Sequence, residues 1–527
     1  MAHRFTFLLL AGAALLAGAS PLAAQADSRR DAARFRRAAE SITEADVRQR
    51  IGIIADDSML GRATPSPQLE EVAAWIADQF RQAGLKPGGD SGTFIQRYGI
   101  RRLRVDSGSF VMVMGHGAHG HWRLGREAVI IFGQPPAQPL TAPIVLLAGM
   151  PTDTARPFGD VPMNGTIVLQ VLDAARIGND LVPLVTRGVS AGVKAWIFVS
   201  NRNVAQFTFL ARTALQPQYE VGGQGAGGPL NISLYEVRDS SAAEVLRAAG
   251  EDPAVLLAPG AAPAVRALAG FTATVDIRRT LESDASAPNT IGVLEGSDPQ
   301  LKNEYVFFTG HMDHIGTASG NEGCRRAGAD TICNGADDDA SGAIAVVELA
   351  QAYAQLDPRP RRSIVFMTVS GEERGLWGSG YYADHPEFPL AATVADLNTD
   401  MIGRNPSDGV MGIGKEHSSL GPLVDSVAAS HPELRMRVIN DTMPRENLFY
   451  RSDHYNFARK GVPILFFTTG LHADYHRPTD SVEKIDAEQE ARIVRLDFYL
   501  GLAVANATSR PVWNPDSYRR IVLQPGQ

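Results

Sequence analysis

The sequence has no excess of positive charge. Its 50 Lys and Arg residues are outnumbered by 58 Asp and Glu residues, so the formal net charge is −8. We find no cluster of Lys and Arg interleaved with aromatic residues, and a nucleic-acid partner is therefore not expected. The composition, 44% hydrophobic and 20% charged, is that of a folded chain and not of a disordered one. A length of 527 residues allows two or three domains.

Long apolar runs are lacking outside the first residues. Arg4 supplies a short positive start, and residues 5–17 are almost wholly apolar. Residues 24–26 offer a small-x-small cleavage site. The run is too short to span a bilayer comfortably, and no stop-transfer pattern follows it. We expect a signal peptide over residues 1–26, export to the periplasm or beyond, and no membrane anchor.

Cysteine is almost absent. The two cysteines, Cys324 and Cys333, lie in one short polar segment. In an exported protein such a pair most simply forms a disulfide that closes a local loop. A pair of thiolate metal ligands is the alternative, although no third cysteine lies nearby to complete such a site.

The pattern along the chain changes twice after the signal. Residues 27–127 begin with helical spacing over 39–54 and 69–84, where Val72, Ile76 and Phe80 recur on one face. Residues 128–263 alternate short β-like runs with connections rich in Gly and Pro, which indicates a separate non-catalytic domain. Residues 264–527 repeat the order strand, loop, helix.

The last segment predicts an α/β sandwich with a mixed, mostly parallel sheet between helices. Its predicted strands are short apolar runs, which suit strands buried on both faces: 305–309, 363–369, 394–398 and 462–468. Residues 342–356 form a helix between the first two. In such folds, ligands bind beyond the carboxyl ends of the strands.

Acidic and histidine side chains follow those strand ends. The candidates are His311 and Asp313, the acidic turn of 335–342 with Asp337, the pair Glu372 and Glu373, Asp400, and His476 with Asp480. Imidazole and carboxylate without thiolate suit Zn²⁺ or a similar ion. Two metals need one bridging carboxylate and terminal ligands on each side, and five ligands from five segments meet that requirement.

Two of these residues suit supporting roles. Side chains of neighbouring residues that leave a strand point in different directions, so one glutamate can bind metal while the other acts as a general base. Asp313, two residues after His311, is placed to accept the free N–H of that imidazole.

These motifs resemble peptidase family M28, which includes bacterial leucyl aminopeptidases and carboxypeptidases. The resemblance rests on residues 310–313, 335–342, 371–373, 398–401 and 475–480, and is close over about 288–500. It implies the zinc exopeptidase fold and two zinc ions per chain. Segments 160–169 and 188–199 also resemble the protease-associated domain inserted in many members, which assigns 128–263 to that domain.

The resemblance also implies a role for each site residue. Asp337 is the bridging carboxylate, Glu373 and His476 complete one zinc site, and His311 and Asp400 complete the other. Glu372 becomes the general base and acid, and Asp313 orients His311.

Two assignments have alternatives. His472 competes with His476 as the last ligand, and Asp480 after His476 favours the latter. Tyr450, shortly before the Ser452-Asp453-His454 motif, is a candidate for stabilising the oxyanion, or else a packing residue.

The expected function is removal of N-terminal residues from peptides, by a water that the metals activate and Glu372 deprotonates. Arg451 and Arg477 lie near the motifs and keep a carboxypeptidase or dipeptidase open, because such enzymes hold a terminal carboxylate. A glutaminyl cyclase and a non-catalytic binding protein are further alternatives. The sequence predicts neither the preferred residue nor the oligomeric state.

Overall fold

The computed structural model describes residues 21–133, 135–177, 181–222, 232–258, 262–318 and 323–523. Most of the expected signal peptide, residues 1–20, lies outside the described residues, so that peptide stays a prediction. No helix within the described ranges combines the length and the apolar character needed to cross a membrane.

One mixed sheet contains ten strands of the described chain. Its centre is parallel, in the order β14 (Ser363–Val369), β13 (Tyr305–His311), β15 (Thr393–Thr399) and β18 (Ile464–Thr468). Almost every side chain of these strands is buried, which explains their continuous apolar runs. The flanking strands are β16 (Gly409–Ile413) and β17 (Arg437–Ile439) on one side, and β12 (Arg279–Leu294), β2 (Ile95–Val105), β9 (Gln218–Val221) and β1 (Lys86–Pro87) on the other.

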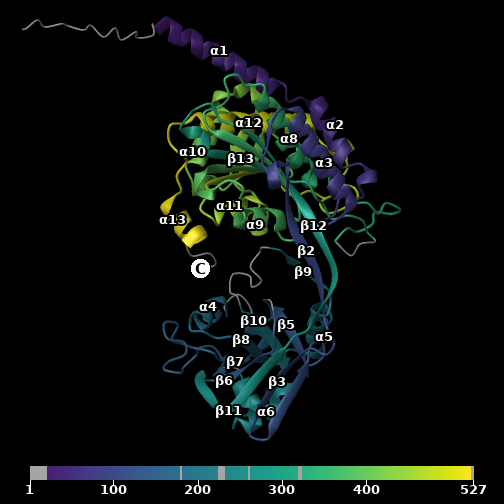
Figure 1. The fold of residues 1–527 in the computed structure, drawn as a ribbon, viewed down its shortest axis with the longest axis vertical. Helices are drawn as coiled ribbons and strands as arrows, with labels where there is room; N and C mark the ends of the chain where they lie inside the picture. Colours follow the sequence, from purple (N-terminus) through teal and green to yellow (C-terminus); the bar gives the residue numbers. More distant parts are fainter. Residues whose placement is uncertain are drawn as a thin grey trace, which may run out of the picture.

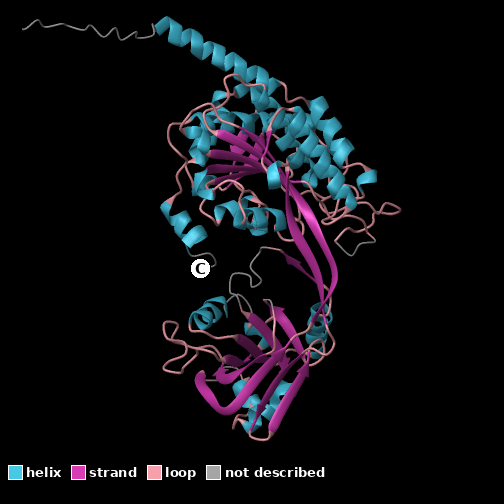
Figure 2. Cartoon of the chain, viewed as in Figure 1, coloured by secondary structure: helices cyan, strands magenta, loops and turns pink. Residues whose placement is uncertain are grey.

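Helices cover both faces of this sheet (Figure 2). One face packs against α2 (Glu44–Ile54), α3 (Pro67–Gln82), α8 (Gly342–Ala354), α10 (Leu420–Ser430) and α12 (Ala487–Asn506). The other packs against α9 (Trp377–Asp384), α11 (His454–Ala458) and the end of the chain near α13 (Pro515–Tyr518). Helix α8 carries Ala, Val and Leu on nearly all sides and is buried accordingly. The predicted α/β sandwich is confirmed.

The predicted helix over 39–54 is divided in two. Helix α1 (Pro21–Glu40) ends before Ser41, and α2 begins after Thr43. The Thr43 side chain accepts the backbone N–H of Asp46, which caps α2 and fixes its start. Figure 1 shows α1 leading away from the rest of the chain.

A second sheet contains eight strands of the described residues. Its order is β4 (Ala118–Arg123), β3 (Phe110–Gly115), β11 (Ala264–Asp276), β6 (Leu140–Ala148), β7 (Ile167–Leu172), β8 (Ala195–Ser200), β10 (Ser233–Arg238) and β5 (Ala128–Phe132). Separate apolar cores fill its two faces. The helices between its strands are α4 (Val182–Ser190), α5 (Val204–Ala214), α6 (Asp239–Ala248) and α7 (Pro253–Leu256).

The second sheet extends past the expected segment 128–263 at both ends. Strands β3 and β4 precede that segment and β11 follows it, and β3 pairs with β11 from Phe110 to Met114. One strand of the segment also belongs to the first sheet, because β9 pairs with β2 there.

Strands β2 and β12 connect the two bodies. They pair antiparallel along the whole of β2, from Ile95 opposite Thr290 to Val105 opposite Arg279. Figure 1 shows this long ribbon running from the helix-covered sheet to the eight-stranded sheet. The chain therefore leaves the first body on β2 and returns on β12.

Candidate metal centre

The side chains predicted to form the site converge at the carboxyl ends of the parallel strands. His311 is the last residue of β13, Asp400 directly follows β15, and Glu372 and Glu373 follow β14. His476 lies in the segment after β18. This edge is where a doubly covered parallel sheet places its ligands.

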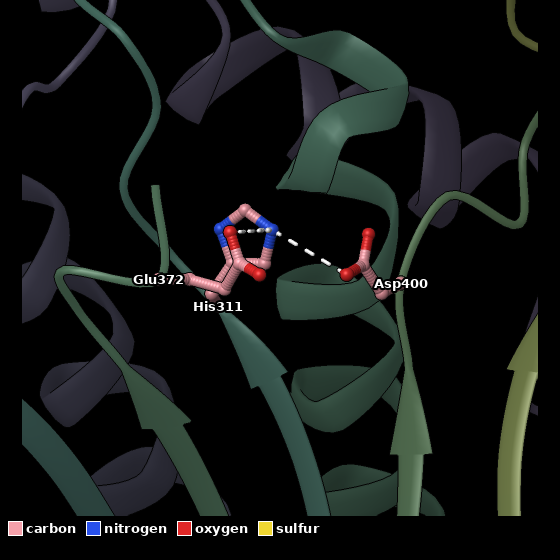
Figure 3. A group of neighbouring side chains, drawn as sticks. All are labelled: His311, Glu372 and Asp400. Atoms are coloured by element: carbon pink, nitrogen blue, oxygen red, sulfur yellow. Dashed lines mark ion pairs between the residues drawn. The ribbon is translucent and has the colours of Figure 1, made fainter. Parts of the chain in front are cut away.

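His311 is the centre of one cluster (Figure 3). Its Nε2 lies 3.4 Å from Asp338 Oδ1, 3.7 Å from Asp400 Oδ2 and 3.9 Å from Glu372 Oε2. The imidazole is 1% exposed, so these carboxylates meet it in a nearly dry environment.

His476 is the centre of a second cluster. Its Nε2 lies 3.1 Å from Glu373 Oε2 and 3.2 Å from Asp338 Oδ2. A third imidazole, His314, faces the same carboxylates, with Nδ1 2.7 Å from Glu373 Oε1. The sequence pointed to His476 but not to His314.

Asp338 joins the two clusters. Its Oδ1 faces His311 and its Oδ2 faces His476, so a single carboxylate presents one oxygen to each side. This is the arrangement expected of a bridging ligand, a role that the family resemblance implied for Asp337.

The carboxylate of Asp337 faces other partners. Its Oδ2 is 3.1 Å from His472 Nε2, and its Oδ1 accepts the backbone N–H of Gly403 at 2.6 Å. Successive side chains of the turn point in different directions, so only one of the three aspartates can face both clusters. The carboxylate that lies between His311 and His476 is therefore that of Asp338 and not that of Asp337.

The same contact separates the two competing histidines. His472 is directed at Asp337, whereas His476 is directed at Asp338 and Glu373. The geometry favours His476 as the member of the cluster, whereas His472 contacts Asp337.

Asp313 contacts His311, mainly through its main chain. His311 Nδ1 lies 3.1 Å from the Asp313 carbonyl oxygen and 3.6 Å from Oδ1. The carboxylate instead accepts the Thr64 hydroxyl at 2.7 Å and the backbone N–H of Glu372 at 3.3 Å. Asp313 thus connects the imidazole of one strand end to the glutamate of the next.

The two clusters fit a divalent ion. Four of their buried ligand atoms have no hydrogen-bond partner within the described chain: His311 Nε2, His476 Nε2, Asp338 Oδ2 and Glu373 Oε1. Tetrahedral zinc with bonds of about 2.0–2.2 Å holds ligand atoms roughly 3.3–3.6 Å apart. The imidazoles of His311 and His476 lie 3.1 to 3.7 Å from Asp338, Asp400 and Glu373, which brackets that spacing.

The pKa shifts of the buried carboxyl groups also favour a bound divalent ion. Burial raises the pKa of Glu372 well above its usual range, and the nearby Glu373 and Asp400 carboxylates raise it further. Burial likewise raises the pKa of Asp339, followed by the effect of Asp400. Carboxylates gathered at such density need compensating positive charge, which a metal ion supplies.

A pocket opens beside the clusters. Asp338, Glu372 and Asp400 form one wall. The other residues that line it include apolar side chains and two polar groups: Met401, Leu448, Phe466, Leu471, Arg451 and Tyr475.

Tyr475, and not Tyr450, is the tyrosine at this pocket. The ring of Tyr475 stacks on the ring of His476, with centroids 3.9 Å apart. Tyr450 is 55% exposed and packs against Phe449 and Tyr455 instead. The position of Tyr475 beside His476 is the sequence signal that could have found it.

The two cysteines form a disulfide. Cys324 and Cys333 are joined, and both pack with Ile315 in a small apolar cluster after β13. The alternative reading as thiolate metal ligands is excluded.

The model of peptidase family M28 matches residues 289–500. Among curated relatives, a probable zinc metalloprotease of Pyrenophora teres f. teres is 26% identical over 286 residues, which cover 46% of this chain and 57% of the relative. Leupeptin-inactivating enzyme 1 of Streptomyces exfoliatus is 27% identical over 217 residues, or 41% of this chain and 42% of the relative. The chain thus spans about half the length of these two relatives.

Among solved structures, an aminopeptidase from Aneurinibacillus sp. strain AM-1 aligns with a TM-score of 0.47 and 20% identity, over 91% of this chain and 98% of the other. The family match covers β13, the acidic turn and the ends of β14, β15 and β18. Over residues 289–500, this chain belongs to peptidase family M28.

Proposed function

We propose that this chain is an exported aminopeptidase that uses two zinc ions held around Asp338. The observation that carries the proposal is the Asp338 carboxylate, whose two oxygens face His311 and His476 separately. His311 and Asp400 would complete one site, and Glu373 and His476 the other. Membership in family M28 over the same residues supports zinc as the metal.

The protein supplies a base beside the metals. When bound, two zinc ions polarise a peptide carbonyl and lower the pKa of water. The Glu372 carboxyl lines the pocket, and its backbone N–H is held by Asp313. We assign to Glu372 the removal of a proton from the attacking water and its transfer to the leaving amine.

Tyr475 is suited to stabilise the negative charge that develops on the carbonyl oxygen. Arg451 Nη2 lies 3.3 Å from the Tyr475 hydroxyl oxygen and donates to it. That bond occupies a lone pair of the hydroxyl and leaves its proton free to donate into the pocket. A donor placed in this way acts as part of an oxyanion hole.

The charges at the pocket favour a substrate with a free amino terminus. Glu372 is the pocket-lining carboxylate that is not assigned to zinc, and it would attract a positively charged α-amino group. A second candidate is a dipeptidase or carboxypeptidase, because Arg451 also lines the pocket. Its guanidinium already pairs with Glu446 at 3.1 Å, which weakens its hold on a further carboxylate.

Two remaining features are part of the proposal. The Cys324–Cys333 disulfide supports export, because such bonds persist in oxidising compartments. We further propose that the eight-stranded body is the protease-associated domain, with limits widened to include β3, β4 and β11.

Hydrolysis of aminoacyl-p-nitroanilides, N-blocked peptides and dipeptides tests the proposal, each with and without a chelator. We expect cleavage of the aminoacyl substrates that is lost on chelation and restored by zinc. Cleavage confined to N-blocked peptides would exclude an aminopeptidase, and a strong preference for dipeptides would favour the second candidate.

A further inference from the structure

A third buried imidazole, that of His314, lies beside the second cluster. It is 1% exposed and follows His311 by three residues, yet its ring faces Glu373 and not the His311 cluster. Its Nδ1 lies 2.7 Å from Glu373 Oε1 and 3.8 Å from Asp338 Oδ2. These three residues form a group whose potential ligand atoms all lie within 4.8 Å of one another.

The short contact between His314 and Glu373 does not have the geometry of a hydrogen bond. Within the described residues, neither ring nitrogen of His314 has a hydrogen-bond partner, and neither has Glu373 Oε1. A hydrogen bond weakens steeply when its angle falls below about 120°. Both atoms are therefore available to a third partner such as a metal ion.

The surroundings hold the ring in place. His314 packs edge-on against the His476 ring, with centroids 5.6 Å apart. On another side it lies against Gly335, where an added Cβ would come within 2.5 Å of the His314 ring. Gly335 also has a φ of 58°, so both its backbone and the ring require glycine there. The imidazole is therefore fixed toward the carboxylates.

We propose that His314 is a fourth protein ligand of the site formed by Asp338, Glu373 and His476. This inference rests on the proposed two-metal centre. It makes the two sites unequal, because one has two imidazoles and two carboxylates, whereas the His311 site has three protein ligands. Four protein ligands are typical of structural zinc and three of catalytic zinc. The His314 site retains its metal longer, and the His311 site exchanges first.

Zinc titration of the chelated, full-length protein tests this assignment with three variants. We expect wild type to bind two zinc ions. His314→Ala and His314→Asn should weaken one of the two sites by about 100-fold, the upper end of what loss of a residue that only holds a ligand costs. His314→Cys should restore that site, because thiolate is a good zinc ligand and amide is not.

Cobalt loading adds a readout independent of activity. A thiolate-to-cobalt charge-transfer band in His314→Cys is expected, and its absence would overturn the assignment. His417→Ala is the control, since His417 lies against Ser517 and Phe449, away from the clusters. Circular dichroism of the chelated variants checks that they fold.

The two proposals fail in different ways. If wild type binds a single zinc ion, the two-metal centre itself is wrong. If wild type binds two and His314→Ala binds both as tightly, only the role of His314 is wrong. Equal restoration by asparagine and cysteine would likewise overturn it, since His314 would then only hold Glu373 in place.

Discussion

The carboxylate of Asp480 accepts the backbone N–H of Asp338 at 3.1 Å. It also accepts the N–H of Asp337, at 3.1 and 3.2 Å to its two oxygens. Asp480 is fully buried and therefore anchors the turn that directs Asp338 at both histidines. The position of the bridging carboxylate depends on this contact from a distant part of the chain.

Asp480→Asn should loosen that turn. The side-chain amide of asparagine would place an N–H against a backbone N–H where one of the carboxylate oxygens now accepts. We expect zinc affinity to fall about 10–100-fold, as for other residues that hold ligands. Competition with a zinc chelator measures the change. Asp474→Asn, a variant of the same segment that loses contacts to Arg404 and Lys484, should keep wild-type affinity. Equal affinities for Asp480→Asn and wild type would exclude the anchoring role.

Glu372→Gln should abolish proton transfer without removing zinc. General base catalysis contributes about 10²–10⁴-fold, so kcat should fall by that factor while the metal content is unchanged. Glu373→Gln is the matched comparison, because it should lose zinc from one site. If Glu372→Gln turned over normally, the base would have to be another group.

Tyr475→Phe and Tyr450→Phe separate the two tyrosines. Loss of one oxyanion donor costs about 10²–10³-fold in kcat, which we expect for Tyr475→Phe. Tyr450→Phe should change kcat less than about twofold, because its ring lies outside the pocket lining. Steady-state kinetics on one aminoacyl substrate measures both, and the opposite order would return the role to Tyr450.

The two bodies should respond separately to core mutations. Phe308 stacks on Phe366 in the first core, and Trp196 is fully buried in the second. Phe308→Ala and Trp196→Ala should each cost about 3–5 kcal/mol of unfolding free energy. Thermal unfolding should then show two transitions, one shifted by Phe308→Ala and the other by Trp196→Ala. Zinc released during heating should appear with the transition that Phe308→Ala shifts. A single transition shifted equally by both would show one cooperative unit.

The strand-end motifs were predictable because metal-binding residue types directly follow apolar runs of the length of a buried strand. His311, Asp400 and Glu373 each follow an apolar run long enough to be a buried strand, and parallel strands bring such ends together. The choice between Asp337 and Asp338 was not predictable from spacing. It depends on the direction of each side chain in the turn, which Asp480 and Gly403 fix from elsewhere in the chain.

The limits of the second body could not be predicted from the sequence for a related reason. Strands β2 and β12 lie far apart in sequence and pair only in the folded chain, so no local pattern marks where one body ends. His314 was likewise not predicted as a ligand, because a lone histidine after a strand usually packs in the core. Its closeness to Glu373 arises from the approach of two strand ends, which only the structure shows.

The zinc content of the purified protein tests the central claim most directly. After exhaustive dialysis and reloading, wild type should hold two zinc ions per chain, and Asp338→Ala should lose both the second ion and activity while Asp337→Ala retains more of each. One zinc per chain in fully active wild type, or two in Asp338→Ala, would contradict a centre bridged by Asp338.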